Sequence, residues 1–384
     1  MKDFAIIGGG PAGSAAALEA RKLGLSVIIW EKEHFPRAKV CGEYISAESV
    51  LYLEGAIPGV MAGAASMQRA EFVSKNGSVA VFPLPRAARG LSRRAMDDAL
   101  WKAAAQAGAT AHEGTAVLRV GRLTDDKESG WEIESTAGTA QARSLIVACG
   151  RWWKIEGLES PTAAQGNSPP GDWLGAKAHF RGIANRGAVE MYYFPGGYCG
   201  LAPIEDGLHN ACCLVHRSLV KRARAGIAQD FRAWIRAVAR HSALDRRLQG
   251  GIQEGVTIAT APVRPARRRA AQGEVLFVGD AAGFLDPFTG DGISMALHSG
   301  RLAAEGLARS LEVRPTSLRQ AAVAYERQLN ESVQRSYAVA TLVRTLVRAP
   351  VFVQGTAAAL IPFLGGRLHA ETRWRHTESK WGTL

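Results

Sequence analysis

Three glycines near the start of the sequence have the spacing of a loop that binds a dinucleotide. They follow the apolar stretch 3–7 and precede an alanine-rich stretch, 14–23. The first glycine permits a tight turn, the second lets backbone approach a diphosphate, and the third lets a helix pack against a strand. The free N–H groups and the dipole of a helix N-terminus favour the negative charge of a diphosphate. The residues expected to contact it are Gly8, Gly10, Pro11, Ala12 and Gly13.

An acidic residue ends the second apolar stretch, 25–30, where dinucleotide-binding folds hold a ribose. Glu31 follows Gly13 by eighteen residues, and its carboxylate would accept hydrogen bonds from a pair of ribose hydroxyls. Lys32 comes next and is expected to line the same site. The alternative is a glycine-rich turn that binds no nucleotide, and the agreement of strand, helix, second strand and acid argues against it. At this point NAD and FAD are equally open.

A second glycine-rich segment lies far along the chain. The buried stretch 274–278 ends at Gly279-Asp280, and a strongly helical stretch, 294–311, begins after further glycines. A helix N-terminus bordered by glycine offers a second place for negative charge. The two glycine segments therefore predict the two halves of a site for a long ligand. The residues expected in the second half are Gly279, Asp280, Pro287, Gly290, Gly292 and Ile293.

A cysteine and a group of aromatic residues are the candidates for chemistry beyond cofactor binding. Cys41-Gly42 lies on a loop directly after the first nucleotide-binding segment. The thiol could approach the reactive ring of a cofactor, and the alternative is a small buried side chain beside a flexible turn. Aromatic side chains also crowd the stretch 192–198, for which ordinary core is the alternative. The catalytic candidates are Cys41, Tyr193 and Tyr198, and no acid–base residue is assigned because the histidines are expected to be packed or exposed.

The pattern of elements predicts an α/β fold of two parts. Strands and helices alternate over 1–172, which would form the first part of a nucleotide-binding domain, with inserted strands around 68–82 that turn at Asn76-Gly77. Alternating apolar and polar residues over 173–260 predict a β-rich domain for the substrate. The remaining segments are the second part of the nucleotide-binding domain, 261–315, and a helical C-terminal region, 316–384.

The composition excludes several kinds of site and partner. The 384 residues carry a net charge of +12, but no nucleic-acid-binding module accompanies the short basic runs, so no nucleic acid is expected as a partner. Five cysteines without metal-ligand spacing argue against a disulfide framework and against a metal site. No apolar run is long enough to span a membrane. These features favour the cytoplasm and leave the oligomeric state open.

The C-terminal region mixes apolar residues with arginines, as in Val343-Arg344 and Val347-Arg348. A basic amphipathic segment of this kind can lie on a membrane surface. The alternative is that it packs against the sheets. Peripheral contact with a membrane is therefore kept as an expectation for this region.

The two glycine segments and the β-rich middle together resemble the FAD-dependent oxidoreductases of the para-hydroxybenzoate-hydroxylase-like group, nearest its geranylgeranyl-reductase and flavin-halogenase branches. The resemblance covers residues 1 to about 311. It implies a Rossmann-like FAD-binding domain of the glutathione-reductase type with an inserted β-sheet substrate domain. It also implies that the first glycine loop holds the diphosphate of FAD, that Glu31 binds the adenosine ribose, and that Asp280 binds the ribityl or diphosphate part.

The same resemblance implies contacts to the flavin ring. Pro287, Gly290 and Gly292 would line the ring. The helix that begins near Ile293 would direct its dipole at the flavin edge that becomes negative on reduction. The loop of Cys41-Gly42 matches the Cys-Gly of the geranylgeranyl-reductase branch, which faces the ring.

Two further segments carry the resemblance. Arg93 matches the arginine that opens a helix in the family and contacts the flavin, with Arg94 as the alternative. The segment 193–197 resembles part of the aromatic-x-Trp-x-Phe-Pro stretch that lines the substrate cavity of the geranylgeranyl-reductase branch, without its tryptophan. A hydrophobic small molecule is therefore the expected substrate.

The resemblance implies a flavin oxidoreductase, and the first expectation is a monooxygenase that hydroxylates an aromatic, polyketide-like or lipid-like molecule through a flavin hydroperoxide. The alternatives are a geranylgeranyl-reductase-like reduction of isoprenoid double bonds and a membrane-associated electron-transfer flavoprotein. Cys149-Gly150 stands where hydroxylases carry Asp-Gly, so NAD(P)H is expected only as a transient reductant. The halogenase segment W-x-W-x-I-P is missing, so halogenation is not expected.

Overall fold

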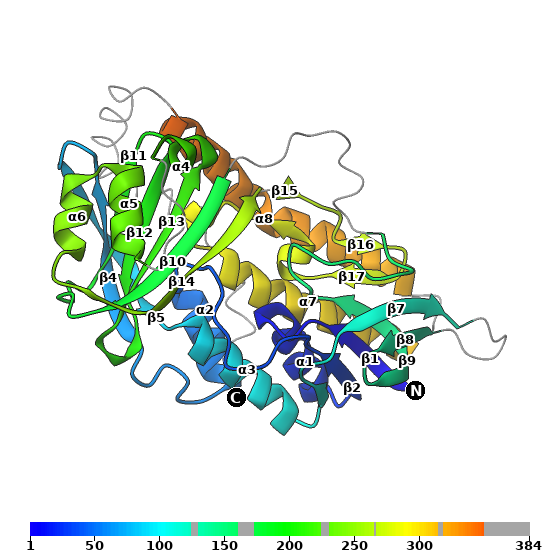
Figure 1. Ribbon diagram of the computed structural model, residues 1–384. Coiled ribbons are helices and arrows are strands. Elements are labelled where there is room, and N and C mark those ends of the chain that lie inside the picture. The colour runs from blue at the N-terminus through cyan, green and yellow to red at the C-terminus, as the bar shows by residue number, and fades with distance from the viewer. Residues whose placement is uncertain (124–129, 160–172, 224–229, 265, 314–317, 349–384) are drawn as a thin grey trace.

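The computed structural model describes the chain except for residues 124–129, 160–172, 224–229, 265, 314–317 and 349–384 (Figure 1). The described residues form two eight-stranded sheets, a two-stranded sheet and helices that cover them. Both large sheets draw strands from distant parts of the sequence. The α/β class predicted from the sequence is confirmed.

The first sheet is built on parallel strands around the N-terminal strand. β1 pairs in parallel with β2 on one side and with β9 on the other, and β17 pairs in parallel with β9. Such strands are buried on both faces and read as continuous apolar runs. The strands, in spatial order, are β16 (Ala271–Gln272), β17 (Val275–Phe277), β9 (Gly138–Val147), β1 (Lys2–Ile7), β2 (Val27–Trp30) and β6 (Thr110–His112), with β7 (Val117–Arg122) and β8 (Trp131–Ser135) extending from β9.

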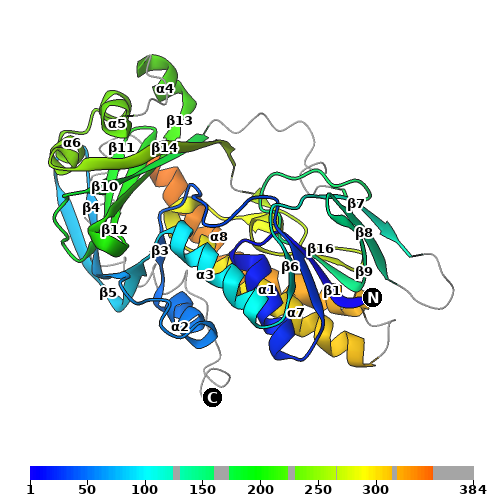
Figure 2. The same ribbon diagram turned by 60° about the horizontal axis from the view of Figure 1, so that its bottom comes forward.

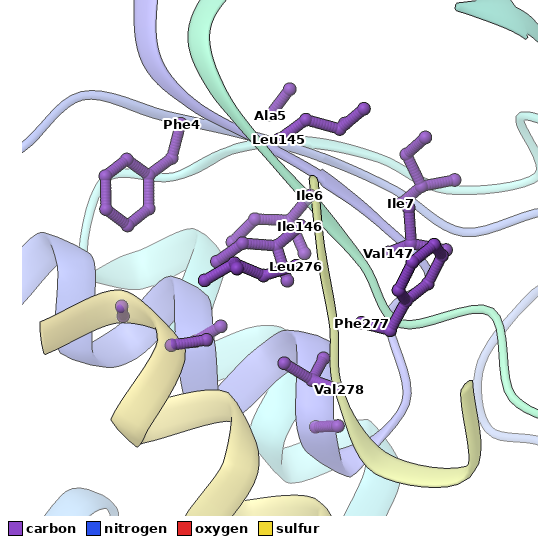
Figure 3. Close-up of a cluster of buried hydrophobic side chains, with 14 of the residues drawn as sticks. Phe4, Ala5, Ile6, Ile7, Leu145, Ile146, Val147, Leu276, Phe277 and Val278 are labelled. Carbon is purple, nitrogen blue, oxygen red and sulfur yellow. The ribbon is translucent and has the colours of Figure 1, made fainter. Parts of the chain in front are cut away.

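Helices pack against this sheet through small and apolar side chains. Ile6, Ile146 and Leu276 lie side by side on three neighbouring strands and are fully buried above the helices (Figure 3). A Cβ at Gly300 would lie 2.1 Å from the Ala12 carbonyl oxygen, so two helices meet there with no room for a side chain. The helices of this part are α1 (Pro11–Lys22), α2 (Ala47–Ala56), α3 (Arg93–Gln106), α7 (Gly292–Val313) and α8 (Leu318–Arg348).

The second sheet is mostly antiparallel, and α4, α5 and α6 cover its outer face (Figure 2). Phe231 and Trp234 of α5 are buried against that face together with Phe180 and Phe194 of the strands. The strands, in spatial order, are β14 (Ile252–Val263), β10 (Trp173–Arg181), β13 (His209–His216), β12 (Gly197–Pro203), β11 (Ala188–Phe194), β4 (Ala65–Val73), β5 (Val79–Gly90) and β3 (Tyr44–Ile45). The covering helices are α4 (Arg217–Ala223), α5 (Phe231–Ala239) and α6 (Ser242–Leu248).

Short elements complete the described chain. β15 (Ala266–Arg267) pairs with β18 (Gly283–Phe284) as the two-stranded sheet. Three 3₁₀ turns lie at Glu205–Gly207 (η1), Gly279–Ala281 (η2) and Pro287–Thr289 (η3). No helix among the described residues is both long enough and apolar enough to cross a membrane.

The structure places several expected segments differently from their sequence pattern. The strands around 68–82 are β4 and β5, which join the second sheet through the parallel pairing of β4 with β11. The C-terminal helix extends through 318–348, and residues 349–384, to which the expected membrane contact partly refers, lie outside the described residues. The second sheet thus takes strands from both sides of residue 172.

Candidate functional site

A cavity of about 1230 Å³ lies between the two sheets and is lined by residues of both. One end is formed by the glycine loop after β1 and by the acid at the end of β2. The other end is walled by aromatic side chains of β4, β5, β11 and β12. The loop 37–44 and the segment 284–290 line the region that joins the two ends. The cavity therefore extends far enough to hold both a dinucleotide and a second molecule.

The glycine loop has the geometry that the spacing predicts. Gly8 has a φ of +107°, and a Cβ there would lie 2.5 Å from the Ala148 carbonyl oxygen. A Cβ at Gly13 would lie 1.9 Å from the Gly8 carbonyl oxygen, so α1 and the loop can pack only around a glycine. Gly10 differs, because the nearest atom to its added Cβ is 3.9 Å away. Backbone at Gly10 is therefore open to the cavity, whereas Gly13 lies beneath the loop and does not line it.

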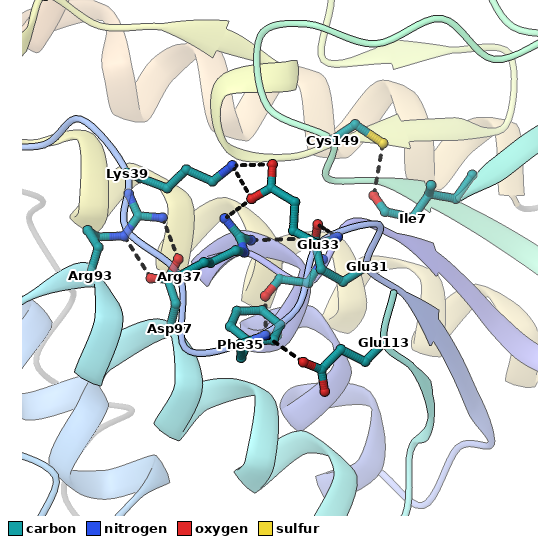
Figure 4. Close-up of polar contacts among 12 residues, drawn as sticks. Ile7, Glu31, Glu33, Phe35, Arg37, Lys39, Arg93, Asp97, Glu113 and Cys149 are labelled. Carbon is teal, nitrogen blue, oxygen red and sulfur yellow. Dashed lines mark hydrogen bonds and ion pairs between the residues drawn. The ribbon is translucent and has the colours of Figure 1, made fainter. Parts of the chain in front are cut away.

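Glu31 is held in place by three donors at the end of β2 (Figure 4). Its Oε2 accepts hydrogen bonds from the Gly9 N–H at 2.9 Å and from Arg37 Nη2 at 3.0 Å. Its Oε1 accepts one from the Glu33 N–H at 3.1 Å. The carboxylate is 7% exposed and lines the cavity together with Lys32. It is thus an oriented, charged acceptor with lone pairs left for hydroxyl groups.

Asp280 marks the second half of the site, directly after β17. The Gly279 N–H before it donates a hydrogen bond to Ser299 Oγ at 2.8 Å, which ties the turn to α7. The Asp280 carboxylate accepts no hydrogen bond from the described residues. Burial raises its pKa, and the nearby guanidinium groups of Arg151, Arg93 and Arg268 oppose that shift. A half-buried carboxylate without donors is suited to a ligand that brings hydroxyl groups.

The N-terminus of α7 meets the cavity beside this carboxylate. Gly292 and Ile293, the first two residues of the helix, both line the cavity, as do Pro287 and Gly290 before it. Gly290 has a φ of +71° and closes the η3 turn. The positive end of the helix dipole therefore points at whatever lies in this part of the cavity.

Arg93, and not Arg94, lines the cavity. Its guanidinium forms two hydrogen bonds with the Asp97 carboxylate, both 2.7 Å long, within the first turn of α3. Burial by itself would lower the pKa of Arg93, but the charge and hydrogen bonds of Asp97 raise it above its usual value. The Cys41 thiol lies next to the same guanidinium. Ser92 caps the helix by accepting the Ala95 N–H, so the cap fixes where Arg93 enters the site.

The Cys41-Gly42 loop is fastened to the second sheet by a buried charge cluster that the sequence analysis did not identify. Glu43 is fully buried with a φ of +55°. Its carboxylate pairs with the buried Lys177 ammonium and lies 2.7 Å from His179 Nε2. Its Oε1 also accepts the Arg93 N–H at 2.8 Å. Burial by itself would raise the pKa of Glu43. The hydrogen bond from His179 and the charge of Lys177 outweigh burial, so the pKa of Glu43 lies below its usual value.

A signal for this cluster was present in the sequence but ambiguous. Lys177 and His179 alternate with alanines along β10, which is the pattern of a strand with one solvated face. Both faces of β10 are in fact covered, since Ala176 and Ala178 lie in the core with α5 and Lys177 on the opposite face is 2% exposed. Only a partner at a distance in sequence, here Glu43, allows such a side chain to be buried.

The far end of the cavity is an aromatic pocket, defined here by Phe72, Phe82, Tyr193, Tyr198 and Phe288. The Phe72 ring stacks on Tyr193 with centroids 5.7 Å apart and on Phe82 at 5.2 Å. Phe288 of η3 lies 5.7 Å from both tyrosine rings. The flavin-facing turn expected at 287–290 thus also supplies one wall of this pocket.

Cys149 follows β9 and lines the cavity beside the glycine loop. Its thiol donates a hydrogen bond to the Ile7 carbonyl oxygen at 3.3 Å (Figure 4). Burial and the negative charge of Glu31 raise the pKa of Cys149 to about 12. The thiol is therefore protonated at neutral pH, and it is a packing residue at the end of β9.

The structure brings nearly all the residues expected from the sequence to one cavity. Gly13 is the exception, for the packing reason given above. The lining residues from that set are Gly8, Gly10, Pro11, Ala12, Glu31, Lys32, Cys41, Gly42, Arg93, Tyr193, Tyr198, Gly279, Asp280, Pro287, Gly290, Gly292 and Ile293. An open glycine cradle, an oriented carboxylate, an unpartnered carboxylate and a helix N-terminus are the groups that a diphosphate, two sugars and an anionic ring require, so the residues present fit FAD.

Comparison with known proteins agrees with this fit. The model of the family described as "FAD binding domain" matches residues 1–334. Digeranylgeranylglycerophospholipid reductase 2 of Methanopyrus kandleri is 30% identical over 333 residues, 82% of this chain and 79% of the relative. Menaquinone reductase of Mycolicibacterium smegmatis is 26% identical over 377 residues, 92% of this chain and 86% of the relative.

Solved structures show the same fold. The flavin-dependent brominase Bmp2 aligns with a TM-score of 0.75 and 21% identity, over 99% of this chain and 95% of the brominase. A geranylgeranyl bacteriochlorophyll reductase-like protein from Thermoplasma acidophilum aligns with a TM-score of 0.73 and 20% identity, over 94% and 91% of the two chains. The chain therefore belongs to the FAD-binding-domain family and is an FAD-dependent oxidoreductase.

Proposed function

We propose that this enzyme reduces carbon–carbon double bonds in the isoprenoid part of a hydrophobic small molecule. The observation that supports this most directly is the aromatic pocket, because it is apolar and opens into the half of the cavity that fits FAD. Two similar proteins are named as reductases of a digeranylgeranylglycerophospholipid and of menaquinone, and both of these molecules carry isoprenoid chains.

The residues of the chain bind and orient the reactants. When bound, FAD supplies two-electron hydride chemistry. The open backbone at Gly10 and the carboxylates of Glu31 and Asp280 would hold the cofactor, and the N-terminus of α7 would favour negative charge in that part of the cavity. The aromatic pocket holds the substrate and excludes water, which favours transfer to carbon over loss of reducing equivalents to solvent.

The Cys41-Gly42 loop lies at the junction between cofactor and substrate. Asn210 Nδ2 donates a hydrogen bond to the Cys41 carbonyl oxygen at 2.9 Å, and the Glu43 cluster fastens the next residues. The loop therefore cannot shift independently of the second sheet. We place Cys41 as the residue that sets the approach of the substrate to the flavin.

Monooxygenation of an aromatic or lipid-like molecule is the second candidate. The observation that favours it is the same aromatic-lined pocket, which suits an electron-rich ring held beside the cofactor. NAD(P)H fits either function as a transient reductant. Incubating the purified yellow protein with NADH and with NADPH tests this, and bleaching by neither nucleotide would point to a separate electron donor.

The two candidates predict different products. Dithionite-reduced holoenzyme is incubated with a prenylated naphthoquinone, once without oxygen and once under heavy oxygen gas, and the product is analysed by mass spectrometry. The proposed reductase yields a side chain that has gained hydrogen in the anaerobic sample. Heavy oxygen in the product, with no anaerobic product, would instead establish the monooxygenase.

A further inference from the structure

Two tyrosine hydroxyls in the aromatic pocket lack hydrogen-bond partners. Tyr193 and Tyr198 lie directly opposite each other on β11 and β12, so their side chains emerge on the same face of the sheet. Both residues line the cavity. Both hydroxyl oxygens are buried, and neither makes a hydrogen bond with any described residue. The Tyr198 side chain as a whole is buried, with the residue 7% exposed.

Aromatic rings pack around these hydroxyls, and no described residue accepts a hydrogen bond from either one. Phe72 and Phe288 pack against the Tyr193 ring, and Phe288 also packs against Tyr198. A buried donor without a partner is costly in free energy. Phenylalanine would fill nearly the same volume at both positions without that cost. The neighbouring Tyr192 shows the ordinary solution, because it points to the other face and donates to Glu190 Oε2 at 2.6 Å.

Both phenols remain donors at neutral pH. Burial raises the pKa of Tyr193 and of Tyr198 well above the usual value, and the negative charge of Asp286 acts in the same direction. Asp286 accepts a hydrogen bond from neither hydroxyl, so both protonated phenols are donors that a ligand can satisfy. The pair therefore selects for an acceptor atom on the bound molecule.

The walls of the pocket define the shape of the group that carries this acceptor. The planes of Phe72 and Tyr193 are within 11° of parallel, and those of Phe72 and Phe82 within 18°. Phe288 closes the other side with its ring tilted by 53° to Tyr193 and by 82° to Tyr198. Stacked and edge-on ring faces of this kind are suited to a flat aromatic group.

We propose that the pocket binds a flat ring that carries a carbonyl oxygen, as in a quinone, and that Tyr193 and Tyr198 donate hydrogen bonds to that oxygen. This inference rests on the proposed function and narrows its substrate class from isoprenoids in general to ring carbonyl compounds that bear an isoprenoid chain. Sites built to hydrogen-bond a polar group reject analogues that lack it far more strongly than apolar pockets do.

A binding experiment on the oxidised holoenzyme tests this without turnover. Menadione, a naphthoquinone, and methylnaphthalene, which lacks its carbonyl oxygens, are titrated separately, and binding is followed by the change in flavin absorbance. The wild type is expected to bind menadione at least about tenfold more tightly. Tyr193→Phe and Tyr198→Phe are each expected to reduce that preference by about three- to tenfold, and the double variant to abolish it.

Tyr192→Phe is the matched control, since its hydroxyl is buried on the opposite face of the same strand and is already bonded to Glu190. It is expected to keep the preference for menadione. Equal binding of the two ligands by the wild type, an intact preference in the double variant, or an equal loss in Tyr192→Phe would each overturn the inference. Because binding is measured without reduction, a tyrosine-dependent preference together with failure to saturate a double bond would disprove only the proposed function.

Discussion

At the residue scale, Glu43 depends on its partners because its charge is fully buried. It is a fully buried carboxylate that pairs with Lys177 and His179 and anchors the loop that carries Cys41. Such a cluster is stable only while its charges remain matched, because one unmatched charge in the interior costs several kcal/mol. The position of Cys41 thus depends on electrostatic balance as well as on packing.

Glu43→Gln is expected to lower the free energy of unfolding by about 3–5 kcal/mol, because it leaves the Lys177 ammonium buried without a counter-charge. The double variant Glu43→Gln with Lys177→Met removes both charges and should recover most of that loss. Urea denaturation of the three proteins measures this. A double variant no more stable than Glu43→Gln would show that the two charges are not coupled.

The same cluster predicts a dependence of stability on pH. The pKa of Glu43 is lower in the folded protein than its usual value of about 4.3, so its contribution to stability is complete near neutral pH. That contribution is lost as the pH falls through the lowered folded value. Wild type should therefore lose more stability than the double variant between about pH 5 and pH 3, as measured by thermal unfolding at each pH.

At the scale of the elements, the glycine loop between β1 and α1 contains glycines with two different roles, ligand binding and packing, which the sequence motif does not distinguish. Gly10 faces the cavity with no atom closer than 3.9 Å to an added Cβ, whereas Gly13 is enclosed by the loop. One glycine is needed by the ligand and the other by the fold. Substitution by alanine distinguishes them.

Gly10→Ala is expected to leave the melting temperature of the FAD-free protein within a few degrees of wild type. It should weaken FAD binding by about tenfold or more, because the methyl group occupies space that the diphosphate needs. Gly13→Ala places a Cβ 1.9 Å from a carbonyl oxygen, so it should destabilise the FAD-free protein by about 1–3 kcal/mol or more. FAD titration and thermal unfolding of both variants measure these effects. The prediction fails if the two substitutions have the same profile.

The sequence predicted these local elements well because each depends on residues close together in the chain. The glycine loop and the Asn76-Gly77 turn are both where their patterns indicate, since turns are decided by a few adjacent residues. Residues 110–122, in contrast, form two strands, β6 and β7, joined by a short segment in which Gly114 has a φ of +66°. Apolar content alone does not reveal such a break.

At the scale of the whole molecule, the site is the cavity between the two large sheets. The cofactor half could be predicted because its two glycine segments each carry a local signature. The substrate half could be predicted only in part, at Tyr193 and Tyr198, because Phe72 and Phe82 join it through long-range pairing, above all the parallel contact of β4 with β11. The Glu43 cluster is of the same kind, since Glu43 and Lys177 are separated by 134 residues. Burial of charge and sheet register are decided by partners that periodicity does not identify.

The most direct test of the proposed reductase is the position of hydrogen added in one turnover. Dithionite-reduced holoenzyme is mixed without oxygen with a prenylated naphthoquinone in heavy water, and the product is examined by mass spectrometry. We predict deuterium bound to carbon in the side chain at the site of a former double bond. A side chain free of deuterium, with only the ring reduced, would contradict the central proposal.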